Sequence, residues 1–115
     1  MVNLVMSENL YNDYLVEGQS MGSNYTSPVQ DLSRTDSYSV QVVMTGSPVG
    51  EFKLQASLDN SNWNDITASI VSVNGSGNIM FVEPDADYDK VRAVYTFTSG
   101  SGIMSIRING KGDFR

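Results

Sequence analysis

Acidic side chains at alternate positions are the feature of this sequence that could do chemistry most directly. Asp85, Asp87 and Asp89 occupy every second position of one short polar segment. Carboxylates at this spacing can surround a calcium ion with oxygen ligands. A helix–loop–helix calcium site also needs a glycine and a later glutamate, whereas Lys90 comes next here and no glutamate follows Glu83. The segment therefore predicts either a calcium loop or a solvated turn, and the sequence suggests no cofactor other than calcium.

The polar turn before the single tryptophan, Trp63, is a second candidate site. In such a turn Asp59 can accept hydrogen bonds from backbone N–H groups, while the indole covers the end of the hairpin. This arrangement predicts a packing role for Trp63. The alternative is an exposed aromatic surface that binds a sugar or a protein partner, to which Tyr11, Tyr14 and Tyr25 would contribute.

Catalysis has little support in the residue types. The chain contains no cysteine and no histidine, which excludes thiol nucleophiles, histidine-based triads and the usual zinc sites. Carboxylate pairs remain, and Glu51, Asp59 and Asp65 are the candidates. Glycoside hydrolysis needs two such acids facing each other across a cleft, and no spacing in this sequence indicates one. We therefore expect a protein that is not an enzyme.

Net charge and hydropathy restrict the partners further. The chain carries 13 acidic and 7 basic residues, a net charge of −6, and the basic residues are scattered, so nucleic acid is not an expected partner. Apolar runs such as Val42–Met44 and Ile79–Val82 are far shorter than the ~20 residues that span a bilayer, so no membrane association is expected. The first residues lack the basic region and long apolar core of a signal peptide.

The elements that would position these candidate residues are short strands. From Ser37 onward, apolar and polar residues alternate with a period of two, and Gly-, Ser- and Asn-rich turns interrupt the pattern. No segment has the periodicity of a long amphipathic helix. This pattern predicts an all-β fold, an antiparallel β-sandwich of jelly-roll or immunoglobulin-like type. The turn Ser99–Gly102 predicts that the last two strands form a hairpin.

The first residues lack this regularity. Residues 1–27 contain apolar side chains with neither helical nor strand period, so we expect an extended N-terminal arm before a sandwich domain of residues 28–115. The arm is expected either to fold back on its own domain or to reach a neighbouring molecule. Val29–Leu32, directly after Pro28, predicts an edge strand, where proline is tolerated.

Several motifs occur in an order that resembles a group of small β-sandwich structural proteins of tailed bacteriophages. The resemblance covers about residues 28–110 and rests on the segments Val29–Leu32, Asp36–Gln41, Gly46–Gly50, Leu54–Trp63 and Tyr88–Tyr95. It implies a virion protein assembled in the host cytoplasm, of the capsid decoration (cement) type or a neck, tail or fibre component. It also implies a homo-oligomer whose partners are other virion proteins and which has no catalytic residues. The alternative function is a carbohydrate-binding or adhesive module.

Overall fold

The computed structural model of the chain describes the backbone of residues 6–84 and 87–114 and the side chains of residues 10–84 and 87–112. It contains strands and one short 3-10 turn, η1 (Thr67–Ser69). No helix among these residues is long and apolar enough to cross a bilayer. The strands are β1 (Met6–Ser20), β2 (Tyr25–Thr26), β3 (Gln30–Asp31), β4 (Ser37–Gly46), β5 (Val49–Ser57), β6 (Asn64–Asp65), β7 (Val71–Asn74), β8 (Gly77–Glu83), β9 (Lys90–Ser99) and β10 (Gly102–Phe114).

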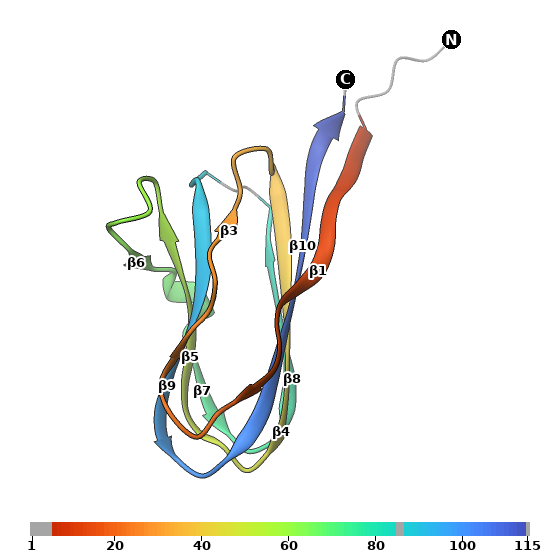
Figure 1. Ribbon diagram of the computed structural model, residues 1–115. Coiled ribbons are helices and arrows are strands. Elements are labelled where there is room, and N and C mark those ends of the chain that lie inside the picture. Colours follow the sequence, from red (N-terminus) through yellow and green to blue (C-terminus); the bar gives the residue numbers. More distant parts are fainter. Residues whose placement is uncertain (1–5, 85–86, 115) are drawn as a thin grey trace.

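Two antiparallel sheets pack face to face (Figure 1). The four-stranded sheet has the order β1-β10-β4-β8; in the second sheet β9 and β5 are central, with β2 and β3 beside β9 and β6 and β7 beside β5. If β2 with β3, and β6 with β7, are each counted as one interrupted strand, the eight strands have the order of a jelly roll. The chain changes sheet at every connection except the one between β5 and β6, which stay in the second sheet. The expected antiparallel β-sandwich is confirmed.

The core is built by the alternation read from the sequence. In β4 the residues Tyr38, Val40, Val42 and Met44 are buried, while Gln41 and Val43 between them are exposed. The same pattern in β5, β9 and β10 supplies most of the other buried positions, because successive side chains of a strand point to opposite faces. The core therefore lies between the sheets, and each sheet keeps one face in solvent.

The expected hairpin of the last two strands is wrong. β9 pairs with strands of the second sheet and β10 with β1 and β4 of the first, so the turn Ser99–Gly102 crosses between the sheets. It packs against the connection between β4 and β5, where the Ser47 N–H donates to the Ser101 carbonyl at 2.8 Å. A Gly/Ser turn is compatible with a hairpin or with a crossing, and here close packing of two connections selects the crossing.

The N-terminal residues belong to the sheets over most of their described length. β1 pairs with β10 from Met6↔Phe114 to Ser20↔Ile103, with three register shifts along the way, and Met21 is fully buried in the core. β2 pairs with β9. The edge strand expected after Pro28 is confirmed as β3, which also pairs with β9.

Candidate functional site

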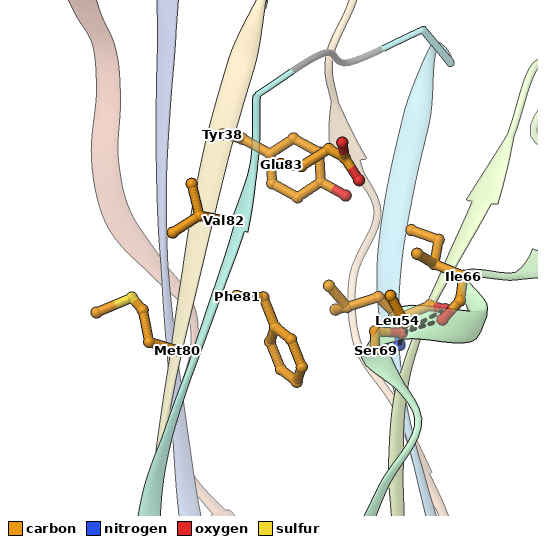
Figure 2. A pocket seen from close by; sticks show the side chains of 9 residues that line it. Tyr38, Leu54, Ile66, Ser69, Met80, Phe81, Val82 and Glu83 are labelled. Atoms are coloured by element: carbon orange, nitrogen blue, oxygen red, sulfur yellow. Dashed lines mark hydrogen bonds between the residues drawn. The ribbon is translucent and has the colours of Figure 1, made fainter.

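An open flank of the sandwich lies between β8 and the segment β6–η1. β8 ends the four-stranded sheet, and in the second sheet β7 pairs with only the first half of β5, Val49–Phe52. The other half leaves a groove with a volume of about 210 Å³, into which Phe81 points toward Leu54 (Figure 2). Phe81 also stacks on Phe52, with ring centroids 5.8 Å apart. Through Phe81, the apolar part of the groove is continuous with the core.

Polar groups lie at one end of this groove. The hydroxyls of Tyr38 and Tyr88 hydrogen-bond to each other, and the side chain of Glu83 lies beside Tyr38 (Figure 2). Burial raises the pKa of both tyrosines, and for Tyr38 the hydrogen bond with Tyr88 raises the pKa further. Both hydroxyls therefore stay protonated at neutral pH, so they offer hydrogen bonds and no nucleophile.

The hydroxyl of Ser69, on the far wall of the groove, forms hydrogen bonds with backbone groups. Its Oγ accepts from the Leu54 N–H at 2.7 Å and donates to the Ile66 carbonyl at 2.6 Å. The side chain is buried, with 2% exposure. Ser69 therefore fixes η1 against β5 and is not poised for chemistry.

The outer face of the four-stranded sheet carries an unusual share of exposed apolar side chains. Strand register places Met80 beside Gln41, which in turn lies beside Arg107, and it places Val82 beside Ser39. Figure 2 shows Met80 and Val82 on the side of β8 opposite Phe81, away from the groove. The exposed apolar side chains of this outer face are Tyr14 (43%), Val43 (41%), Met80 (57%), Val82 (71%) and Ile103 (46%).

Two basic residues, Arg107 and Lys111, lie on the β10 part of this outer face. Arg107 lies with its guanidinium carbon 4.5 Å from the ring centroid of Tyr14 and donates from Nε to Asn12 at 3.3 Å. Lys111 follows on the same face of β10. In a chain with a net charge of −6, the β10 part of this face thus combines an exposed apolar side chain, Ile103, with two cations.

The outer face of the second sheet carries a connected row of polar side chains that ends at Trp63. Lys53 forms an ion pair with Asp65 at 3.0 Å, and Gln55 donates to the other oxygen of Asp65 at 2.9 Å. Arg92 Nε donates to Gln55 Oε1 at 2.9 Å, and its guanidinium lies 4.1 Å from the centroid of the Trp63 ring. The hydrogen bond from Gln55 and the ion pair with Lys53 lower the pKa of Asp65.

The turn before Trp63 has the local hydrogen bonds that the sequence predicts. Asp59 Oδ1 accepts from the backbone N–H groups of Ser61 and Asn62 at 2.9 and 2.8 Å, and Ser57 Oγ accepts from Asn60 N at 2.9 Å. These backbone donors lower the pKa of Asp59. The Asp59 carboxylate thus stabilises its own turn by accepting hydrogen bonds from the backbone.

The other aromatic candidates lie apart from Trp63. The Tyr11 hydroxyl is within 2.9 Å of Thr35 Oγ1, and burial raises the pKa of Tyr11. Tyr25 lies on β2 and packs partly against the core. Tyr14 belongs to the outer face of the four-stranded sheet. The structure therefore distributes Tyr11, Tyr14, Tyr25 and Trp63 over different surfaces.

The acidic segment expected to hold calcium falls partly outside the described residues, because Asp85 lies there. Asp87 is exposed, and Asp89 forms an ion pair with Lys90 at 3.2 Å. Among the side chains that the structure describes, no group of three or more potential ligands could hold a metal ion. A calcium loop at Asp85, Asp87 and Asp89 stays a prediction.

The exposed apolar residues of the outer face could have been predicted from apolar runs in the sequence, which depart from the alternation of apolar and polar residues. Ile79–Val82 and Val42–Met44 are apolar at successive positions, so they place apolar side chains on both faces of their strands. Such runs are typical of strands that are covered on both faces. Within this chain only the inner face is covered, which leaves Val43, Met80 and Val82 in solvent.

Comparison with known proteins gives a fold relationship. No protein-family model matches the chain, and no curated protein matches it. The structure is similar to the crystal structure of the SPBc2 prophage-derived protein YomS, with a TM-score of 0.61 and 15% sequence identity over 96% of this chain and 100% of that one. A structure described as "CBM4 structure and function" has a TM-score of 0.44 and 13% identity over 94% of this chain and 78% of that one, which is too distant to support an argument. The chain thus shares its all-β fold with a phage-derived protein along their whole lengths.

Proposed function

We propose that this chain is a non-catalytic structural component of a phage particle, a capsid decoration protein or a part of the neck, tail or fibre, and that it acts through protein–protein contacts. The observation that carries the proposal is the group of exposed apolar side chains on the outer face of the four-stranded sheet. Exposed apolar side chains that gather on one face of a protein mark a candidate interaction site. The fold shared with a prophage-derived protein supports the phage context.

The face has the composition of a contact surface. Exposed apolar side chains of β4, β8 and β10 share this face with Arg107, which is stacked on Tyr14. Aromatic residues, methionine and arginine are enriched at protein interfaces, and stacked arginine loses less freedom when it is covered. Many copies on a repeating lattice would need only modest affinity each, because neighbouring contacts add avidity.

The test is the composition of purified particles. Particles produced by induction of the phage or prophage that encodes the chain would be separated on a density gradient and analysed by quantitative mass spectrometry. We expect the chain in the particle fractions at a constant ratio to the major capsid protein. Its presence only among the soluble proteins would contradict the proposal.

Rebinding then locates the contact. Particles lacking the chain would be mixed with the purified full chain and sedimented. Val43→Glu and Ile103→Glu place charge on the outer face of the four-stranded sheet and should lower the bound fraction at least tenfold. Leu58→Glu is the matched control, because Leu58 is 73% exposed but lies in the turn after β5. Equal binding of all three variants would exclude this face as the contact.

A second candidate function is carbohydrate binding on the second sheet, and the row from Lys53 to Trp63 favours it. Fixed amide, carboxylate and guanidinium groups beside an aromatic ring are the kind of polar and stacking groups that orient a ligand. Trp63 is the only tryptophan, so its fluorescence reports binding there directly. A glycan screen followed by fluorescence titration should give a saturable change that Gln55→Ala abolishes. A screen without hits would remove this alternative.

A further inference from the structure

Three of the sheet edges are protected against pairing with another strand. β1 carries three register shifts and the acidic residues Asp13 and Glu17. The edge beside β9 consists of the two-residue strands β2 and β3, with Pro28 between them. The edge beside β5 consists of β6 and β7, which η1 separates. Bulges, charges, proline and short strands are the usual means by which proteins prevent edge-to-edge association.

The fourth edge, β8, has none of these features between Gly77 and Val82. It pairs with β4 in one uninterrupted register from Tyr38↔Glu83 to Met44↔Gly77. From Gly77 to Val82 it contains no charged residue and no proline. Its outward side chains include Val82 and Met80, which are 71% and 57% exposed. A regular, uncharged, apolar edge strand offers its free backbone groups to a further strand.

We propose that β8 pairs with β8 of a second copy of this chain, antiparallel and around a two-fold axis at Met80. The two four-stranded sheets would then form one continuous eight-stranded sheet. The proposal rests on the proposed function, because it names a second copy of the chain as one partner of the four-stranded sheet. It concerns the edge of that sheet and not its outer face, so it can be measured without particles.

The sequence of β8 is self-complementary in this register. Met80 is the central residue of Gly77–Glu83, so a two-fold axis there places Asn78 opposite Val82 and Met80 opposite Met80 of the second copy. Glu83, the only charged residue of the strand, lies opposite Gly77. The two Glu83 carboxylates are then about 20 Å apart at ~3.4 Å per residue, beyond the ~8 Å screening length at physiological salt. No like charges face each other directly.

Charge and size set the expected strength of the pair. Each copy has a net charge of −6, so long-range repulsion weakens the pair and salt should strengthen it. Standard stable interfaces bury about 800 Å² on each partner, more than a seven-residue edge covers alone. The pair should therefore be weak and concentration-dependent in dilute solution, and lattice neighbours would strengthen it in a particle.

Engineered cysteines test the register, because the native chain contains no cysteine. Side chains directly opposite each other on antiparallel strands have Cβ atoms about 4.5–5.5 Å apart, within reach of a short bis-maleimide. Met80→Cys alone should give a covalent dimer. Asn78→Cys and Val82→Cys should cross-link strongly when mixed and weakly when separate. Leu58→Cys, at a more exposed position, is the control and should remain monomeric.

Light scattering on the full chain over a range of concentrations provides the second measurement. We expect a reversible rise toward twice the monomer mass that increases with salt. Met80→Lys puts like charges opposite each other and should raise the midpoint concentration at least about tenfold, while Ile103→Lys should not. A chain that stays monomeric and gives no Met80→Cys cross-link overturns the proposal, as does a dimer indifferent to Met80→Lys. Presence in particles without pairing would refute this inference alone, and pairing without presence in particles would refute the proposed function alone.

Discussion

The guanidinium of Arg92 lies 4.1 Å from the centre of the Trp63 ring, and the Arg92 Nε donates to Gln55 at 2.9 Å. These contacts tie three segments together: β9 through Arg92, β5 through Gln55, and the turn after β5 through Trp63. Trp63 is therefore held against the sheet by a cation on a neighbouring strand. This explains how a turn rich in exposed polar residues keeps one orientation.

Removal of the Arg92 charge should destabilise the protein measurably. Arg92→Met keeps most of the apolar stem but loses the cation–π contact, about 0.5–1 kcal/mol at a partly exposed site, and a hydrogen bond of about 0.5–1.5 kcal/mol. We expect the free energy of unfolding to fall by about 1–2.5 kcal/mol, measured by urea titration with circular dichroism. Arg34→Met, at an exposed arginine between β3 and β4, is the control. Equal stability of the two variants would contradict this account of Trp63.

The crossing between β9 and β10 should be intolerant of a side chain at Gly100. Its φ is +79°, and a Cβ there would collide with the carbonyl oxygen of Ser47 on the other crossing. Gly75 also has a positive φ, +98°, but a Cβ there meets nothing within 4 Å. Gly75→Ala should therefore cost only the left-handed conformation, about 1–2 kcal/mol, and Gly100→Ala distinctly more. Similar melting temperatures for the two variants would show that the crossings are not packed as described.

The sequence predicts the strands well because their alternation is a local property. β4 and β5 fall where apolar residues recur at every second position, as in Phe52 and Leu54. The sheet to which a strand belongs is not local, so the Gly/Ser turn at Gly100 is ambiguous until its contact with Ser47 is known. The alternation did not predict β1, because its three register shifts change which residues face the core within one strand.

The two candidate surfaces, the polar row that ends at Trp63 and the outer face of the four-stranded sheet, could be predicted only in part. Trp63 is a conspicuous residue, but its partner Arg92 is 29 positions away and is reached only through the pairing Gln55↔Arg92. The apolar run Ile79–Val82 already indicates a strand with two apolar faces. The sequence does not show that β8 lies at the edge of its sheet. The outer face of β8 is not covered within the chain, so Met80 and Val82 are exposed and do not form part of a core.

The paired hydroxyls of Tyr38 and Tyr88 give a further prediction. Tyr38 is 3% exposed, so Tyr88→Phe leaves its hydroxyl without the hydrogen bond and should cost about 1–3 kcal/mol of unfolding free energy. Tyr14→Phe changes an exposed tyrosine and should stay within about 0.5 kcal/mol of the native chain. Chemical denaturation at pH 7 distinguishes the two. A neutral effect of Tyr88→Phe would mean that the hydroxyl pair does not stabilise the fold.

The same pair predicts unfolding in alkali. The folded pKa values of Tyr38 and Tyr88 are raised, chiefly by burial, so the protonated form is favoured in the folded state. Their contribution to stability is complete below the unfolded pKa of about 10 and is lost as the pH rises through the folded values. Tyrosine absorbance and circular dichroism should therefore change together above pH ~10. Full ionisation of these tyrosines in a chain that remains folded would contradict the burial of the pair.

Asp59 makes the opposite prediction at acid pH. Hydrogen bonds from the backbone N–H groups of Asn62 and Ser61 lower its pKa, so the folded state favours the ionised carboxylate. The contribution to stability is present above the unfolded pKa of about 3.9 and is lost as the pH falls through the lower folded value. Asp59→Asn removes this contribution, so its deficit relative to the native chain should be largest near neutral pH and should shrink below pH ~4.

Urea unfolding measured between neutral and acid pH provides the comparison. Leu58→Asn is the control, because it changes the neighbouring exposed residue to a neutral polar one and should differ from the native chain by the same amount at every pH. A constant difference for Asp59→Asn as well would mean that the turn is held by hydrogen bonds to a neutral acceptor. If the stability difference between Asp59→Asn and the native chain disappears at acid pH, the negative charge of Asp59 orders the turn that carries Trp63. The reason is that protonation removes the stabilising charge from the native carboxylate, whereas the asparagine is unaffected by pH.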